Sequence, residues 1–250
     1  MIAVFFFLLI STYVGHAQVI NAESERKHSD SAGWKGNLGM NMTLIQNTQT
    51  IFLVNAESHL QYTTTGDKGL WLFLGSYGFL KTNGVENVSN AYLHIRYNKK
   101  LNNWLRWEIF GQYQNNAITQ IDSRFLFGTG PRFKLIKVKK FRMYTGCLFM
   151  YEREKEKTDP VIVHNDLRNS SYISFSWNPR ENIELTSTTY YQPLLKKFAD
   201  YRVMNQLGFK INATPHFGME TKWSYLYDSY PAGEAPKAPF LFSTGFSYDF

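Results

Sequence analysis

Hydrophobic and small polar residues alternate along much of this chain, and the alternation is clearest in the last eleven residues. One parity carries aromatic side chains and the other carries mainly Ser, Gly and Asp. Side chains of a β-strand alternate between its two faces, so this segment is predicted to be a strand with one aromatic face. The aromatic positions are Phe240, Phe242, Phe246, Tyr248 and Phe250.

Similar runs, separated by turn residues, recur about every 18 residues and predict about twelve strands, with ten as the fallback. Only the run 70–81 is apolar on both parities, so its faces cannot be assigned from the sequence. An even count suits an antiparallel up-and-down β-barrel in a membrane. The predicted runs cover residues 35–45, 51–63, 70–81, 91–97, 105–114, 124–132, 141–152, 172–177, 183–192, 202–211, 217–225 and 240–250.

The connections between these runs support a barrel with two different ends. Every second connection is short: 65–69, 98–103, 138–140, 178–182 and 212–215. The long connections fall among the others, at 83–90, 154–168, 192–200 and 228–238. Short turns on one side and longer loops on the other are typical of outer-membrane barrels, in which the short turns are periplasmic.

The first residues predict export from the cytoplasm. An unbroken apolar run over 2–10, followed by small residues up to Ala17, is typical of a cleaved signal peptide and is too short to span a bilayer. We therefore expect a signal peptide at 1–17, a flexible periplasmic lead-in at 18–32 and an outer-membrane barrel at 33–250. A terminal aromatic strand also resembles the signal read by the barrel assembly machinery, which assigns that role to Phe246, Tyr248 and Phe250.

Composition agrees with strands that have one apolar and one polar face. Aromatic residues make up 17% of the chain, yet mean hydropathy is only −0.34. The single cysteine, Cys147, excludes an intramolecular disulfide. The formal net charge is +7, but most basic residues are scattered, so no nucleic-acid partner is expected. One cluster, at 134–142, suits a solvated turn that meets anionic phosphate or lipid head groups.

Two sets of residues are candidates for function. Four tryptophans near the ends of predicted runs are expected to form an interfacial girdle: Trp34, Trp104, Trp177 and Trp223. Charged and amide side chains on the polar parity of three consecutive strands are expected to meet in the lumen: Arg106, Glu108, Gln112, Arg124, Arg132 and Glu152. Such a lattice can brace the wall, close the lumen, line a narrow polar path or bind an anion. With three Arg against two Glu, slight anion preference is expected of any conductance.

The same strands carry a family resemblance. A Glu and a Gln on one strand, followed by Arg, Gly, Gly and Arg at alternate positions on the next, resembles an uncharacterised family of outer-membrane barrels. That family includes proteins described as salt-induced. About a third of the chain carries the resemblance directly, and it implies fold and location but no established chemistry. The matching residues are Glu108, Gln112, Arg124, Gly128, Gly130 and Arg132, with Tyr151 and Glu152 on the following strand.

These observations predict a monomeric outer-membrane barrel that acts as a small passive channel or stabilises the envelope. Its expected partners are outer-membrane lipids and, during biogenesis, the assembly machinery. No enzyme activity, cofactor or metal is expected, because no histidine has the spacing of a metal site or a serine-nucleophile motif. Two alternatives stay open: an outer-membrane enzyme acting on lipid or lipopolysaccharide, and a secreted soluble β-barrel or sandwich that binds a ligand.

Overall fold

The computed structural model describes residues 32–46, 50–117, 119–214 and 217–248, which form one antiparallel sheet of twelve strands. Each strand pairs with its neighbours in the sequence, so the topology is up-and-down. The strands are β1 (Gly33–Gln46), β2 (Thr50–Thr63), β3 (Gly69–Thr82), β4 (Val85–Lys100), β5 (Leu105–Asn116), β6 (Ile121–Val138), β7 (Phe141–Glu156), β8 (Val163–Arg180), β9 (Ile183–Leu194), β10 (Lys197–Asn212), β11 (Phe217–Asp228) and β12 (Phe240–Tyr248). A short 3-10 helix, η1 (Thr65–Asp67), lies between β2 and β3.

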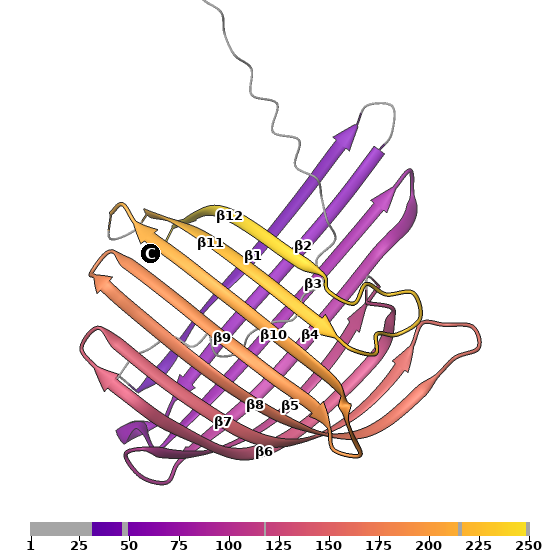
Figure 1. Cartoon of the computed structure of the whole chain (residues 1–250). Helices are drawn as coiled ribbons and strands as arrows, with labels where there is room; N and C mark the ends of the chain where they lie inside the picture. Colours follow the sequence, from indigo (N-terminus) through magenta and orange to yellow (C-terminus); the bar gives the residue numbers. More distant parts are fainter. Residues whose placement is uncertain (1–31, 47–49, 118, 215–216, 249–250) are drawn as a thin grey trace, which may run out of the picture.

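The sheet curves so that two of its parts face each other. Figure 1 shows β1–β5 as one wall and β7–β11 as the wall in front of it. The expected all-β fold with twelve strands is therefore confirmed. Among the described residues no ladder pairs β12 with β1, so the strand order runs from β1 to β12 without a ring closure. No helix in the described part of the chain is long and apolar enough to cross a membrane.

The two faces of the sheet differ as the alternation predicts. Phe127 and Phe149 point outward and are 58% and 63% exposed, whereas their inward neighbours Gly128 and Leu148 are buried. The structure also assigns the faces of β3: Leu70, Leu72 and Leu74 point inward and are buried. Apolar side chains on the outer face and mainly polar ones on the inner face are the arrangement of a membrane barrel turned toward lipid.

The turns lie at two ends of the sheet. Connections after even-numbered strands lie at what we call the even-turn end, and all five are short, as predicted. Connections after odd-numbered strands lie at the odd-turn end. Two of those expected to be long are tight instead, because the strands extend into 83–90 and 192–200 and leave only two-residue turns, at 83–84 and 195–196. Asn83 and Gly84 have φ values of 51° and 80°, the positive pair that a type I′ hairpin turn requires.

Candidate functional site

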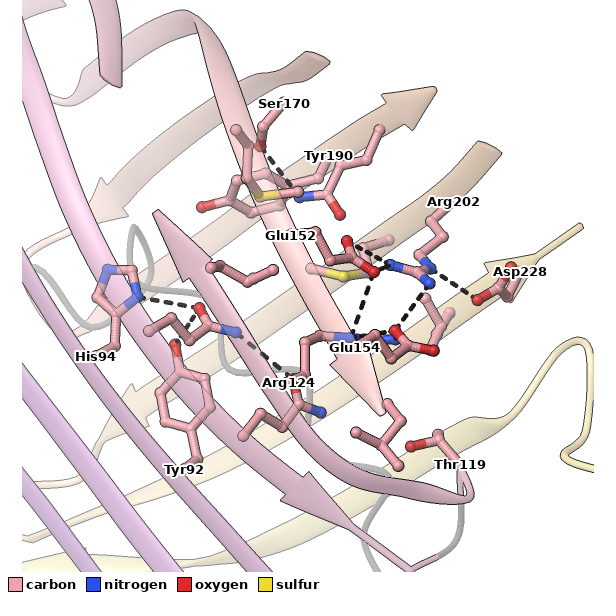
Figure 2. Close-up of a pocket in the computed structure, with 18 of the residues that line it drawn as sticks. Tyr92, His94, Thr119, Arg124, Glu152, Glu154, Ser170, Tyr190, Arg202 and Asp228 are labelled. Atoms are coloured by element: carbon pink, nitrogen blue, oxygen red, sulfur yellow. Dashed lines mark hydrogen bonds and ion pairs between the residues drawn. The ribbon is translucent and has the colours of Figure 1, made fainter. Parts of the chain in front are cut away.

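The inner face encloses a cavity near the odd-turn end of the sheet. It contains about 990 Å³ of space, its open mouth included, and Figure 2 shows side chains from both walls pointing into it. The lining has three parts: an apolar belt, a network of neutral polar groups and a cluster of charges. The connection between β11 and β12 contributes Pro231, Ala232, Ala235 and Pro236 to the lining.

The apolar belt crosses the interior at the base of the cavity. It consists of Phe110, Leu148, Met150, Tyr172 and Tyr190, all buried and packed together. Two glycines make room for its rings. A Cβ at Gly128 would lie 2.3 Å from the Phe110 ring, and one at Gly146 would lie 2.3 Å from the Tyr172 ring. Glycine is required on these strands because aromatic side chains occupy the space above its backbone.

The neutral polar network consists of Tyr92, His94 and Gln112 on β4 and β5, and the guanidinium group of Arg96 contacts it. Arg96 donates from Nε to His94 Nε2 at 3.3 Å, and His94 Nδ1 lies 3.1 Å from Gln112 Oε1. Because His94 Nε2 accepts, its Nδ1 carries the proton and donates to Gln112. The Tyr92 hydroxyl donates to the same Gln112 oxygen at 3.2 Å. Figure 2 shows Tyr92 and His94 pointing into the cavity, where both are hydrogen-bonded to the same amide oxygen.

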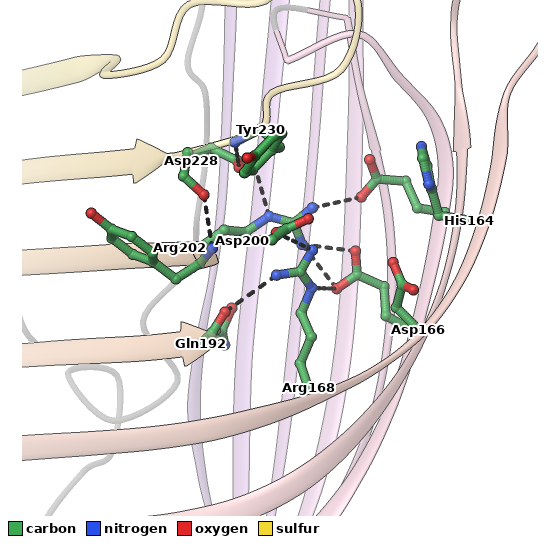
Figure 3. Close-up of polar contacts among 12 residues, drawn as sticks. His164, Asp166, Arg168, Gln192, Asp200, Arg202, Asp228 and Tyr230 are labelled. Carbon is green, nitrogen blue, oxygen red and sulfur yellow. Dashed lines mark hydrogen bonds and ion pairs between the residues drawn. The ribbon is translucent and has the colours of Figure 1, made fainter. Parts of the chain in front are cut away.

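The charged group, which we call the Arg202 cluster, closes the cavity toward the odd-turn end. It consists of Arg124, Glu152, Glu154, Arg168, Asp200, Arg202 and Asp228. Arg202 Nη1 donates to both carboxylate oxygens of Glu152, at 2.7 and 2.8 Å, and its Nε donates to Asp228 at 2.7 Å. Glu152 lies on β7 and Arg202 on β10, so the contact spans the interior rather than neighbouring strands (Figure 2). Figure 3 shows the ion pair of Arg202 with Asp228 in the same cluster.

The remaining members complete the pairing. Arg124 donates to Glu154 at 2.6 Å, and Arg168 contacts Glu152 at 3.4 Å and Asp200 at 2.9 Å. The cluster thus holds three guanidinium groups and four carboxylates, with most side chains buried. Buried charges are tolerated when they are paired and hydrogen-bonded in this way.

Glu154 lies beyond the apolar surface of the sheet, since its neighbours on β7, Arg153 and Lys155, are charged and exposed on the outer face. Burial alone would raise the pKa of the Glu154 carboxyl. The positive charges of Arg124 and Arg202 outweigh that effect and lower the pKa to about 2. Glu154 is therefore ionised at neutral pH and holds both guanidinium groups.

The β11–β12 connection covers the mouth of the cavity. The backbone N–H of Glu234 donates to Gln120 Oε1 at 3.0 Å, which ties this connection to the β5–β6 turn. Lys197 Nζ lies 3.9 Å from the centre of the Tyr230 ring. Ala232 and Ala235 are buried above the cavity. The mouth is thus narrowed by backbone and small side chains as well as by the Arg202 cluster.

The six residues predicted to meet in the lumen all face inward, but they fall into separate groups. Arg124 and Glu152 belong to the Arg202 cluster. Glu108 accepts from the Tyr172 hydroxyl at 2.8 Å and lies 3.7 Å from both Arg96 and Arg132. Gln112 belongs to the neutral network, and Arg106 pairs with Asp67 in η1 at 2.6 Å.

The prediction that these six residues meet in a single cluster is therefore wrong, although all of them face the interior. The register of the strands explains why they do not meet. Glu152 lies opposite Leu126 on β6, six residues along that strand from Arg132. At about 3.3 Å per residue, the two charges are roughly 20 Å apart along the strand direction. Residues of the same parity lie on the same face of the sheet, but they can lie far apart along the strand direction.

Three of the four predicted girdle residues lie near the even-turn end and are exposed: Trp34, Trp104 and Trp177. Trp223 differs, because it lies in the middle of β11 and packs against Phe242 at 5.5 Å between ring centroids. An aromatic row that the sequence analysis missed runs beside Trp34 across β2, β3 and β4 through paired positions: Tyr62, Trp71 and Tyr97.

The proposed assembly signal is described only in part. Phe246 and Tyr248 lie in β12, paired with Met219 and Phe217. Phe250 lies outside the described residues, as do the expected signal peptide at 1–17 and nearly all of the lead-in at 18–32.

Several residues of the site were missed in the sequence: Arg96, Glu154, Tyr172, Arg168, Asp200, Arg202 and Asp228. Arg96 and Arg202 carry charge on the polar parity of predicted runs, and that was the available signal for them. The charged residues Glu154, Arg168, Asp200 and Asp228 fall in stretches that were predicted to be connections, so strand parity gave no signal for them. What the sequence does not contain is the contact between β7 and β10, since two strands separate them.

A family model described as "Protein of unknown function, DUF481" matches residues 46–250. The chain belongs to this family. The match bears out the resemblance to an uncharacterised family. A search of curated proteins finds no match.

Solved structures with a similar strand arrangement are distant in sequence. The NanC porin is 10% identical, with 84% of this chain and 100% of that one covered and a TM-score of 0.49. The translocator domain of the autotransporter NalP from Neisseria meningitidis is 11% identical, with 92% of each chain covered and a TM-score of 0.48. LpxR from Salmonella typhimurium is 10% identical, with 78% and 88% covered and a TM-score of 0.39. Each likeness is too distant to indicate an activity for this chain.

Proposed function

We propose that this DUF481 protein is a monomeric outer-membrane β-barrel that acts as a narrow passive channel for small solutes. Its support is the contrast between the two faces of the sheet: exposed aromatic residues outside, paired charges and amides inside. Strands of 12 to 18 residues over β2 to β11 exceed the roughly 9–11 residues needed to cross a bilayer, so their ends extend into water.

The observation that supports a narrow lumen is the contact of Arg202 with Glu152 across the interior. Together with the β11–β12 connection, it obstructs the odd-turn mouth of a lumen that is otherwise wide enough to hold a cavity. A twelve-stranded barrel has an interior wider than a packed eight-stranded one and narrower than a porin channel. A constriction of paired charges in such a lumen passes small solutes only.

Charge balance revises the expected selectivity at this constriction. Its three guanidinium groups face four carboxylates, so the anion preference argued from Arg106, Arg124 and Arg132 has no support here. Arg106 lies at the other end of the sheet. We therefore propose weak selectivity at the Arg202 cluster.

We propose no catalytic role and no cofactor. His94 contacts Gln112 and Arg96, and His164 pairs with Glu156 at 2.7 Å, arrangements that include no serine or cysteine nucleophile. Outer-membrane lipids and the barrel assembly machinery remain the proposed partners, without nucleic acid. The salt-induced description of the resembled family stays a prediction, which quantifying the protein after growth at graded salt concentrations would test.

Two measurements test the proposal. The protein should sediment with outer membranes and migrate differently on gels before and after boiling; recovery from the soluble periplasmic fraction would favour a secreted protein instead. In planar bilayers, the wild type should show small conductance steps. The double variant Arg202→Ser/Glu152→Ser, which removes one charge of each sign, should show larger steps.

The control is Lys155→Ser/Asp122→Ser, a pair 2.8 Å apart whose side chains are 47% and 41% exposed. It also removes one charge of each sign and should leave conductance unchanged. If neither the wild type nor the Arg202→Ser/Glu152→Ser variant conducts, the lumen is no pathway, and the envelope-stabilising role takes its place.

A further inference from the structure

A second group of inward-facing charges lies at the even-turn end, away from the cavity. We call it the basic mouth and define it by Lys100, Arg106, Lys134, Lys137 and Arg142, with Asp67 beside them. The register places these cations next to one another on one face. Lys100 is directly opposite Arg106, and Lys137 is directly opposite Arg142.

Like charges that face each other across a ladder are destabilising unless an opposite charge lies between them. Asp67 supplies part of that charge: it lies 2.6 Å from Arg106 and 3.7 Å from Lys100. Burial alone would raise the pKa of Asp67. The hydrogen bond and charge of Arg106, with Lys100 and Lys137, outweigh it and hold that pKa below its usual value.

Asp67 forms ion pairs with two of the five cations, Arg106 and Lys100. Lys134 lies within electrostatic range of Lys137, Arg106 and Lys100. Among the described residues, neither Lys134 nor Arg142 forms an ion pair with a carboxylate. Arg106 uses Nη2 for Asp67, while its Nη1 is buried without a hydrogen-bond partner in the described part of the chain. The basic mouth therefore offers a hydrogen-bond donor, Arg106 Nη1, in a region of positive electrostatic potential.

We propose that the basic mouth is a binding site for an oxyanion of the phosphate class. A phosphate has several acceptor oxygens and multiple negative charge, which suits guanidinium and ammonium groups that lie together. It would accept hydrogen bonds from Arg106 Nη1 and Lys134 and lie between the facing cations, while Arg142, opposite Lys137, would add to the positive charge around it. The site does not depend on whether the lumen conducts.

The position of the site favours an anion that arrives through water. The basic residues face the interior, whereas the outward neighbours at the same level are apolar and exposed: Leu135, Ile136 and Val138. In the outer-membrane barrel proposed above, lipid chains would contact these outer side chains. The phosphate group thus comes from a solute in the mouth or from a lipid head group that bends around the rim, and experiment separates these two sources.

The test uses the full-length protein in an uncharged detergent free of phospholipid. Inorganic phosphate is titrated and binding is followed by calorimetry and by ³¹P NMR line width. Saturable binding is expected, weakened about tenfold or more by Lys134→Gln/Arg142→Gln, since charge-assisted bonds to phosphate are the strong ones. Lys134→Gln alone gives a second reading if the double variant does not fold, which heat-modifiable gel migration reports.

The matched control is Arg153→Gln/Lys155→Gln, which also removes one Arg and one Lys but on the outer face at the odd-turn end. It should bind phosphate as the wild type does. In a parallel arm, bound phosphatidylglycerol is counted by native mass spectrometry after exposure to mixed vesicles of phosphatidylglycerol and phosphatidylcholine.

Phosphate binding lost in the Lys134 and Arg142 variants supports the site and a solute source. Selective phosphatidylglycerol retention lost in the same variants, without binding of free phosphate, supports the site and a lipid source. Absence of both, or an equal loss in the control, overturns the proposal.

Discussion

Arg202 on β10 holds both carboxylate oxygens of Glu152 on β7, although β8 and β9 lie between their strands. The two side chains therefore approach through the interior, and their contact joins parts of the sheet that share no backbone ladder. Arg202 also binds Asp228 on β11, so one guanidinium connects three strands. This arrangement both braces the curvature of the sheet and narrows its interior.

The first prediction concerns the cost of breaking this contact. Arg202→Met should lower the free energy of unfolding by about 3–5 kcal/mol, because Glu152 and Asp228 are left buried without their cation. Unfolding by guanidinium chloride in detergent, followed by tryptophan fluorescence, measures the change. Lys155→Met, which removes one partner of the partly exposed ion pair with Asp122, should cost less than about 1 kcal/mol. Equal effects of the two variants would show that Arg202 does not brace the sheet.

A second prediction concerns acid. The pKa of Glu154 is lowered in the folded protein, so its carboxylate contributes stability in full above its unfolded pKa of about 4.3. That contribution should be lost as pH falls through the folded-state pKa of about 2. Unfolding free energies measured from about pH 6 down to about pH 2 should decline, and less steeply in Glu154→Gln. A parallel decline in both proteins would assign the acid sensitivity to other carboxylates.

The third prediction concerns the glycine beneath the Phe110 ring. Gly128→Ala places a Cβ 2.3 Å from that ring and should destabilise the protein by about 1–3 kcal/mol through overpacking. Phe110→Leu in the same chain should restore part of the loss. Gly111→Ala is the control, because its Cβ would meet nothing nearer than 3.7 Å. Unfolding midpoints of these three variants are compared with that of the wild type; no rescue by Phe110→Leu would contradict the packing explanation.

The fourth prediction rests on the sequence of the terminal strand. Deleting Phe250 should reduce the amount of folded barrel in the outer membrane, because an unpaired strand edge cannot persist in lipid and the terminal aromatic residue is expected to guide closure. Signal cleavage, checked by mass, should be normal. Asp249→Ser, one residue away on the other parity, should assemble as the wild type does. Normal amounts of folded barrel after the deletion would show that Phe250 is not needed as an assembly signal.

Much of the architecture could be predicted from local pattern. Strand number and the two faces follow from alternation with a period of two, as the exposed Phe127 and Phe149 illustrate. The short even turns were predicted as well. The two-residue turn at Asn83 and Gly84 was not, because polar residues that continue a strand at its end look like loop residues in a sequence.

Other features required the tertiary structure. Residues 70–81 are apolar on both parities, and only the curvature of the sheet decides that Leu72 points inward. Parity placed Arg132 and Glu152 on the same face but could not say that different partners hold them.

The sequence by itself determined that twelve strands alternate between an apolar and a polar face, because side-chain direction in a strand depends only on neighbouring residues. The tertiary structure decided which inward charges meet. Arg202 reaches Glu152 because the register of strands β7 to β10 and the curvature of the sheet together place the two side chains close to each other across the interior. Neither the register nor the curvature can be read from a local sequence pattern.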